Sequence, residues 1–353
     1  MDYAKKLAEL LEMVVGQGGS DLHLVAGTSP VLRVAGALTP ILTEPVLTSD
    51  DILGLLTVML TQEHKKRFLE SQEIDFSYAY GTKGRFRGNG FFERGHVGVA
   101  LRLIPKVIRT AAELNLPPGI EAFASRKQGF FLVVGPVGQG KTTTLAALIE
   151  KINTERAEHI VTIEDPIEYL FESKKSIIEQ REVGIDTRDF ESALASVFRQ
   201  DANVVMIGEM RTPVTMATAV TAAETGHLVL STLHTNNAAQ TIDRIIDTFP
   251  AGQQDQIRVQ LAGSLIGIFS QRLITRISGG LVPAYELLLN NNAVANLIRE
   301  KRTHEIQTVI ETGLEDGMID MNRSLADLVR AGEISVESAY TRSWNPKNLE
   351  RLL

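Results

Sequence analysis

The sequence predicts an α/β protein with a small α+β domain at residues 1–104, a linker at 105–117, and an α/β domain at 118–353 whose C-terminal part is mainly helical. Two observations support this prediction. After about residue 118, short apolar segments alternate with helical patterns, which is typical of a mostly parallel sheet. Before it, strand-like segments such as DFSYAY and VGVALRLI accompany two helical patterns, and prolines cluster where the two parts join.

The composition is that of a globular protein and excludes several classes of function. Hydrophobic residues make up 44% of the 353 residues and charged residues 22%. A net charge of -7 argues against a general nucleic-acid binder, and the lack of cysteine excludes thiol catalysis and cysteine-ligated zinc. No apolar stretch approaches the roughly 20 residues of a membrane span, and no secretory signal is recognisable, so we expect a cytoplasmic protein.

The N-terminal domain is predicted to contain helices near residues 2–15 and 49–70 and a strongly basic segment at its end. In the first helix, apolar residues recur at the three and four spacing of one buried face. Residues 83–109 carry seven basic side chains against the single acid Glu93, a net charge of +6. The basic side chains are Lys83, Arg85, Arg87, Arg94, Arg102, Lys106 and Arg109.

Arginine suits bidentate contact with phosphate, so we interpret the pairs of guanidiniums on this segment as candidate arginine fingers for a nucleotide. The finger would come from the same or a neighbouring subunit. A solvated strand face, or a patch for lipid or RNA, is the alternative.

Residues 135–142, GPVGQGKT, match the P-loop pattern G-x-x-x-x-G-K-[ST] between the apolar strand GFFLVVG and the helical pattern KTTTLAALIEKIN. The glycines let backbone amides curl around an anion, and the start of the helix adds its dipole. Lys141 is expected to reach the β and γ phosphates of ATP, and Thr142 to ligate Mg²⁺. The predicted nucleotide-binding residues are Gly135, Pro136, Val137, Gly138, Gln139, Gly140, Lys141, Thr142 and Thr143.

Two further predicted strands end in carboxylates. HIVTIED ends in Glu164 and Asp165, and NVVMIGE ends in Gly208 and Glu209. Ligands of a parallel sheet gather at the carboxyl ends of its strands. We therefore expect Glu209 to act on Mg²⁺ and the attacking water, and a carboxylate after the first strand to orient water or act as general base. A capping glutamate and solvated loop acids are the alternatives.

His227 and His234 bracket the apolar segment LVLSTL. Their separation of seven residues places them on opposite faces of an ideal strand, so they are not expected to ligate one metal together. One or both are candidates for contact with the γ phosphate, and structural histidines are the alternative.

Several segments together resemble the PilT family of type IV pilus retraction ATPases, within the secretion ATPase superfamily. They are GPVGQGKTTT, TIEDPIEY, IGEMR, AVANLIRE and the long block TAAETGHLVLSTLHTNNAAQTIDRIIDTFP at residues 221–250. The resemblance begins at GGSDLHL near residue 18 and covers nearly the whole chain. It implies a PAS-like N-terminal domain followed by a RecA-like P-loop ATPase domain, with ATP and Mg²⁺ as cofactors.

The resemblance also implies a homohexamer with ATP between the two domains, and pilin removal through a PilC-like platform protein of the inner membrane. The ring would lie in the cytoplasm against that membrane at the pilus base, with a paralogous pilus ATPase as a further partner and no nucleic acid. By motif matching, Glu164 falls in the Asp box, Glu209 in Walker B, and His227 and His234 in the His box. Arg87 and Arg102 take the arginine-finger positions.

Alternatives within and beyond the family remain open. The segment usually written AIRNLIRE has Val294 and Ala295 here, which keeps an accessory retraction ATPase of the PilU type as an alternative. An assembly or type II secretion ATPase is disfavoured because it normally carries a four-cysteine zinc module and a longer N-terminal region. A small-molecule kinase would need neither the block at residues 221–250 nor the arginine-rich domain. Gln139 replaces a commoner small residue, which a backbone cradle should tolerate.

Overall fold

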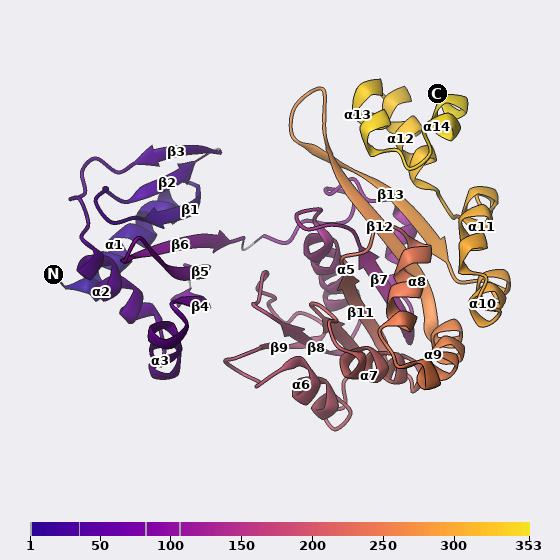
Figure 1. Cartoon of the computed structure of the whole chain (residues 1–353), viewed down its shortest axis with the longest axis horizontal. Helices are drawn as coiled ribbons and strands as arrows, with labels where there is room; N and C mark the ends of the chain where they lie inside the picture. The colour runs from indigo at the N-terminus through magenta and orange to yellow at the C-terminus, as the bar shows by residue number, and fades with distance from the viewer. Residues whose placement is uncertain (1, 35, 82, 106) are drawn as a thin grey trace. The chain divides into compact units, whose positions relative to one another are not determined.

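The computed structural model describes residues 2–34, 36–81, 83–105 and 107–353, so Lys106 of the basic segment lies outside the described residues. The chain forms two compact units, each with its own sheet (Figure 1). The first unit comprises Met1–Val107 and Pro166–Leu170. The second comprises Ile108–Asp165 and Phe171–Leu353.

The first unit is a six-stranded antiparallel sheet with three helices. Its elements are α1 (Tyr3–Gly16), β1 (Gly19–Leu24), β2 (Val31–Val34), β3 (Ala37–Pro40), α2 (Ser49–Met59), α3 (Gln62–Ser71), β4 (Glu73–Tyr80), β5 (Gly84–Glu93) and β6 (His96–Ile104). The strand order is β3-β2-β1-β6-β5-β4. The helical pattern at 49–70 proves to be two helices, because Thr61 starts a new one by accepting a hydrogen bond from the His64 amide at 3.1 Å.

One face of this sheet forms a core and the other carries charge. The predicted face of α1 is fully buried, with Leu7 and Leu11 packed in one cluster with Leu22 of β1 and Leu101 of β6. Neighbouring side chains along a strand point to opposite faces of the sheet. The residues next to Leu22 in β1 and next to Leu101 in β6 therefore lie on the face away from this core. The sheet therefore presents a polar row on its other side.

The second unit has a seven-stranded sheet in the order β13-β12-β7-β11-β10-β8-β9. All neighbours pair in parallel except β12 and β13. Up to α9 the elements are η1 (Pro118–Ile120), α4 (Glu121–Ala124), β7 (Gly129–Val134), α5 (Lys141–Glu155), β8 (His159–Glu164), β9 (Ile177–Glu182), α6 (Phe190–Val197), β10 (Val204–Ile207), α7 (Pro213–Glu224), β11 (Leu228–Leu233), α8 (Ala238–Asp247) and α9 (Ala251–Ser264).

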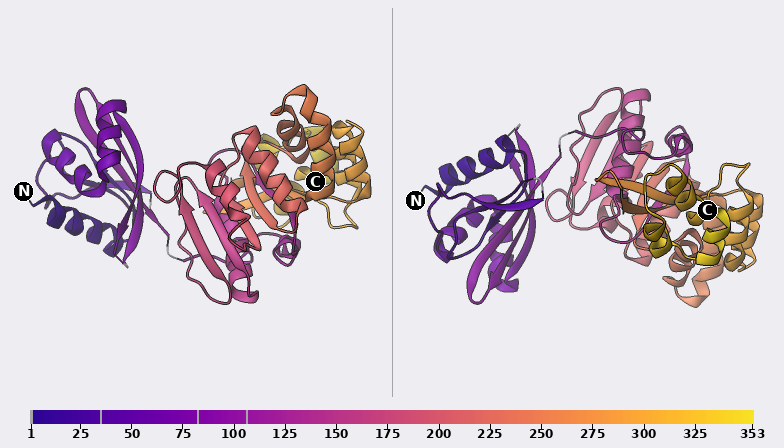
Figure 2. Two further views of the ribbon diagram at one scale, coloured as in Figure 1. Left: turned by 90° about the horizontal axis from the view of Figure 1, so that it is seen from below. Right: turned by 90° about the horizontal axis from the view of Figure 1, so that it is seen from above.

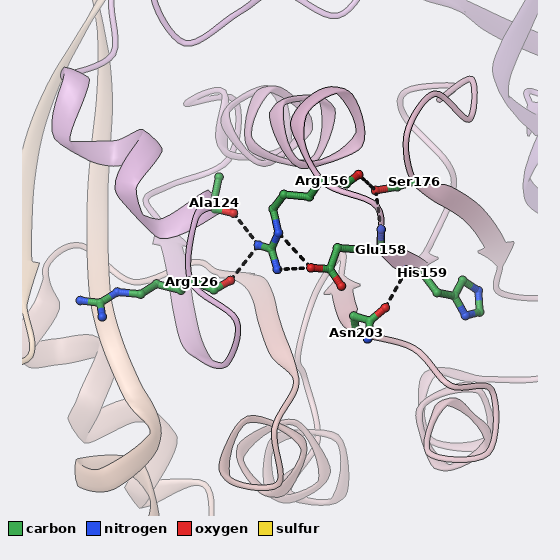
Figure 3. Close-up of polar contacts among 7 residues, drawn as sticks. All are labelled: Ala124, Arg126, Arg156, Glu158, His159, Ser176 and Asn203. Atoms are coloured by element: carbon green, nitrogen blue, oxygen red, sulfur yellow. Dashed lines mark hydrogen bonds and ion pairs between the residues drawn. The ribbon is translucent and has the colours of Figure 1, made fainter.

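Helices cover both faces of this sheet, as the predicted strand and helix alternation requires. Phe130 and Leu132 of β7 pack in one cluster with residues of α6 to α10, and the alternate residues Phe131 and Val133 pack with α4 and α5. The amino edge of the sheet is fixed by Arg156, whose guanidinium donates to Ala124 O, Arg126 O and Glu158 Oε1 (Figure 3). The candidate site lies at the opposite edge of the sheet, where the parallel strands have their carboxyl ends.

The C-terminal part is mainly helical as predicted, but it also contains two long strands that the sequence analysis missed. They are β12 (Leu265–Thr275) and β13 (Leu281–Leu289), followed by α10 (Asn292–Arg299), η2 (Thr303–Glu305), α11 (Ile306–Thr312), α12 (Met321–Arg330), α13 (Val336–Arg342) and α14 (Pro346–Leu352) (Figures 1 and 2). Both strands are buried on both faces, so their sequences lack the alternation that separates strand from helix.

The replaced positions of the AVANLIRE segment lie in α10, where Val294 is fully buried and Ala295 is 7% exposed. Across the described ranges, no helix combines the length and apolar character that crossing a bilayer requires.

Candidate active site

The P-loop joins the buried central strand β7 to α5. Gly138 and Gly140 have φ of 76° and 77°, a region that side chains disfavour. A Cβ on Gly135 would lie 2.5 Å from the carbonyl oxygen of Gln271, and one on Gly140 would lie 3.1 Å from the Gln271 amide nitrogen. Helix α5 begins at Lys141 with no side-chain cap from Gly140. The glycines are therefore required by space and by backbone conformation, and the start of α5 is suited to an anion.

Lys141 joins this loop to the predicted histidine. Its side chain is buried, and Nζ donates to the carbonyl oxygens of Gly135 and Pro136 at 2.9 Å each. Nζ also lies 3.2 Å from Nδ1 of His234. Because an ammonium group only donates, Nδ1 must accept and the ring proton is on Nε2. Burial lowers the pKa of His234 and the charge of Lys141 lowers it further, which agrees with a neutral ring.

Glu209 completes a cluster at the carboxyl ends of β7, β10 and β11. Its Oε1 lies 3.7 Å from Nε2 of His234, and its Oε2 accepts a hydrogen bond of 2.8 Å from Nη2 of Arg211. This hydrogen bond from Arg211 lowers the pKa of Glu209. Glu209 is thus an ionised acceptor beside a neutral imidazole and the P-loop lysine.

Glu164 ends β8, beside Gly208 at the end of β10. It is 3% exposed, and its Oε1 accepts hydrogen bonds from Thr162 Oγ1 at 2.7 Å and Gln180 Nε2 at 3.1 Å. A Cβ on Gly208 would lie 3.3 Å from the carbonyl oxygen of Ile163. The tight approach of the β8 backbone therefore favours glycine at the position before Glu209.

His227 lies apart from this cluster. It precedes the six-residue strand β11 whereas His234 follows it, a separation of about 20 Å along the strand. Its Nδ1 lies 3.0 Å from the carbonyl oxygen of Ala222, and its ring packs edge-on against Phe198 with centroids 5.6 Å apart. Within one chain, then, the structure brings His234 but not His227 to the P-loop.

Gln271 of β12 contacts the P-loop, a role that the sequence analysis missed. Its Oε1 accepts from Thr144 Oγ1, and its Nε2 donates to the carbonyl oxygen of Gln139, both at 2.7 Å. The Gln139 side chain in turn accepts from the amide of Leu273 at 2.8 Å. Gln139 therefore has a structural role, because its two hydrogen bonds connect the P-loop to β12. With β12 unrecognised as a strand, no signal pointed to this contact.

Two cavities adjoin the site within the second unit. One of about 340 Å³ lies beside the P-loop, and its lining includes Gly140, Thr143, Thr144, Leu114, Leu273 and Pro283. The other, of about 460 Å³, has Glu209 and His234 in its wall together with Arg211 and Arg244. Glu209 and His234 thus border this second cavity.

The candidate arginine fingers lie on the polar face of the first unit. The register places Arg102 of β6 directly between Asp21 of β1 and Arg87 of β5. Nε of Arg102 donates to Oδ1 of Asp21 at 2.8 Å, and Nη1 of Arg87 lies 3.8 Å from Oε1 of Glu168. The Arg102 side chain is 73% exposed and that of Arg87 is 45% exposed. Both guanidiniums are therefore presented on one surface of the first unit.

Comparison with known proteins assigns the family. Residues 4–312 match the family described as Type II/IV secretion system protein. The type IV pilus retractation ATPase PilT of Pseudomonas aeruginosa is 42% identical, over 97% of this chain and 99% of the relative. The type IV pilus ATPase PilU of the same organism is 39% identical, over 98% and 90%.

A crystal structure described as the pilus retraction motor PilT with bound ADP superposes with a TM-score of 0.90 at 44% identity, over 98% of both chains. The chain spans nearly the full length of these relatives, and the motifs that carried the resemblance lie in the matched region. The chain therefore belongs to the type II/IV secretion system protein family and, within it, to the PilT family of type IV pilus retraction ATPases.

Proposed function

We propose that this chain is an ATPase motor subunit that couples ATP hydrolysis to disassembly and retraction of a type IV pilus, the basis of twitching motility. The observation that carries the proposal is the convergence of Lys141, Glu209 and His234 at one edge of the parallel sheet, around a P-loop. The proposal that the motor acts on a pilus rests on the relatives named above, which include pilus retraction ATPases.

The nucleotide would lie with its phosphates on residues 135–143 and its base in the cavity of about 340 Å³ beside Thr143. The positive φ values and the uncapped start of α5 suit the phosphates. The apolar side chains of Leu114, Leu273 and Pro283 suit the flat faces of adenine.

Mg²⁺ would be held by Thr142 and Glu209 together with phosphate oxygens of the nucleotide. Among the described residues, no group of three or more His, Asp or Glu side chains could hold a metal alone. This agrees with an ion that keeps few protein ligands and arrives with its phosphates. When bound, it would neutralise charge on the β and γ phosphates.

The chemistry required of the protein is to hold a water in line with the γ phosphate and to stabilise charge. Glu209, ionised at neutral pH, is an acceptor for that water. Nε2 of His234 carries a proton and lies 3.7 Å from Oε1 of Glu209, so it would donate to the water or the phosphate. Glu164 accepts hydrogen bonds from Thr162 and Gln180 and would orient the attacking water or act as general base.

Arg87 and Arg102 would supply the positive charge that phosphoryl transfer needs, from this subunit or a neighbour. We propose a homohexamer that acts on a PilC-like platform protein, in the cytoplasm at the inner membrane. An accessory motor of the PilU type is the second candidate, favoured by Val294 and Ala295 in place of the usual isoleucine and arginine. The charge balance and the relatives give no support to a nucleic-acid partner.

The biochemical test is ATP hydrolysis by the purified chain and by Lys141→Ala, with the exposed Lys127→Ala as matched control. Hydrolysis by the wild type and the control, and none by Lys141→Ala, is expected because Lys141 lies in the P-loop where the phosphates would bind, whereas Lys127 precedes β7 at its other end. The cellular test is deletion of the gene. Retained or excess surface pili with lost twitching supports retraction, and loss of pili refutes it.

A further inference from the structure

Strand β12 sends alternate side chains to two parts of the candidate site. Gln271 points to the P-loop, as described above. Its neighbours Ser270 and Arg272 lie on the other face of the strand, because side chains alternate. They contact the loop of residues 235–237, which follows His234 and leads into α8.

Arg272 makes the densest set of these contacts. Its side chain is buried, and Nη2 donates to both the carbonyl oxygen and Oδ1 of Asn236, at 3.1 and 3.0 Å. Nη1 donates to the carbonyl oxygen of Gln271 at 2.9 Å. On the other side, the guanidinium lies over the ring of Trp344, 5.9 Å from its centroid. The guanidinium is therefore held by several contacts, and two of its three hydrogen bonds go to Asn236.

Two neighbours on the β12 and β13 hairpin hold the same loop. Oγ of Ser270 donates to the carbonyl oxygen of Asn236 at 3.2 Å. Glu286 of β13, directly opposite Ser270, is fully buried and accepts from the amide of Ala238 at 2.8 Å. The hairpin thus fixes the chain two and four residues after His234.

We propose that Arg272 is a positioning residue for ATP hydrolysis: it holds the loop after His234 so that the imidazole stays between Lys141 and Glu209. The inference rests on the proposed function of this site. It goes beyond that proposal because the hydrogen bonds of Arg272 go to Asn236 and to the backbone of Gln271, although its Nη1 also lies 3.2 Å from where a Cβ on Gly135 would stand.

The chemistry of the side chain explains why arginine is needed. A buried cation is costly unless its donors are satisfied, and the planar guanidinium satisfies them with carbonyl and amide oxygens in a fixed fork. A lysine has one compact ammonium group and cannot reach Gln271 and both oxygens of Asn236 with the same geometry. Arg272→Lys therefore keeps the charge and loosens the loop.

The test is steady-state ATP hydrolysis by Arg272→Lys, with Arg276→Lys as matched control. Arg276 follows β12 closely but pairs with Glu333 at 3.3 Å instead of the loop. We expect kcat of Arg272→Lys to fall by at least about tenfold with KM for ATP within about twofold, since a small misplacement of a reacting group is costly. The control should keep its kcat within about twofold.

A double-mutant cycle with His234→Ala separates positioning from general damage. If Arg272 acts through His234, Arg272→Lys should lower kcat by less than about twofold in the His234→Ala background. An equal loss in both backgrounds, or a wild-type kcat for Arg272→Lys, would overturn the proposal. If Arg272→Lys does not fold, the exposed Asn236→Ala takes its place in the cycle with the same criterion.

The outcomes also separate this proposal from the proposed function. Absence of ATP hydrolysis in the wild type would reject the function itself. A wild-type kcat for His234→Ala would reject the role of His234, and the positioning role of Arg272 with it, while ATP hydrolysis stands.

Discussion

Replacing Glu286 by glutamine is expected to stabilise the second unit at alkaline pH and to have little effect at acidic pH. Glu286 is fully buried, and this burial raises the pKa of its carboxyl from 4.5 to about 8. Its Oε1 accepts from the amide of Ala238, whereas Oε2 has no hydrogen-bond partner within the described part of the chain. The folded protein therefore favours the protonated acid.

The sign and size of the effect follow from linkage. Because the folded state binds this proton more tightly, stability falls as pH rises from about 4.5 to about 8, and the full loss is reached above that range. At about 1.36 kcal/mol per pKa unit, the raised pKa corresponds to a loss on the order of 5 kcal/mol. Glutamine stays neutral and keeps an oxygen for Ala238, so Glu286→Gln should lack this loss.

The assay is urea unfolding at pH 5 and pH 8.5, followed by the fluorescence of Trp344, the one tryptophan of the sequence, which lies in the second unit. The variant should be more stable than the wild type at pH 8.5 by several kcal/mol and within about 1 kcal/mol at pH 5. The exposed Glu315→Gln controls for the change in net charge. Parallel pH profiles for Glu286→Gln and the wild type would refute the reasoning.

Three further predictions concern the reaction. Glu209→Gln should bind ATP with wild-type affinity but not hydrolyse it, and unchanged hydrolysis would remove this carboxylate from the mechanism. Since burial and Lys141 lower the pKa of His234 from 6.5, protonation of its ring should depress kcat only below pH 6.5, and a pH profile of His234→Asn should lack that limb. Arg102→Ala should lower turnover without a change in unfolding temperature. Mixed with Glu209→Gln it should regain activity if the arginine acts between subunits, and no regain in mixed rings would count against such a site.

The sequence was sufficient for those parts of the site that local patterns specify. The P-loop is recognisable because its glycines, the strand before it and the helix after it are contiguous, and Glu209 and His234 each follow an apolar strand. The convergence of these residues follows from a general property of parallel sheets. The pairing of Arg87 with Arg102 was not predicted, because it depends on the register between β5 and β6.

The parts that the sequence did not reveal depend on burial and on long-range contacts. Strands β12 and β13 are buried on both faces, and an apolar run of that kind does not distinguish strand from helix. Because the two strands were missed, Gln271, Arg272 and Glu286 could not be placed beside the P-loop or the loop after His234. Both His227 and His234 were predicted as candidates for contact with the γ phosphate, and within one chain they lie at opposite ends of β11, so His234 but not His227 lies beside the P-loop.

The contact of Arg102 with Asp21 bears on whether this arginine can serve a nucleotide. The Arg102 side chain is 73% exposed whereas that of Asp21 is 9% exposed, so the ion pair is neither fully exposed nor fully buried, and the cost of losing it depends on what else contacts Asp21. Asp21 would keep a second cation if Arg102 left, because Nε of Arg33 lies 3.7 Å from its Oδ2 and Ser20 Oγ donates to the same oxygen at 2.8 Å. Release of Arg102 toward a phosphate is therefore inexpensive. The same argument requires that Arg102→Ala fold normally, so a loss of turnover in that variant would report on the reaction and not on the stability of the sheet.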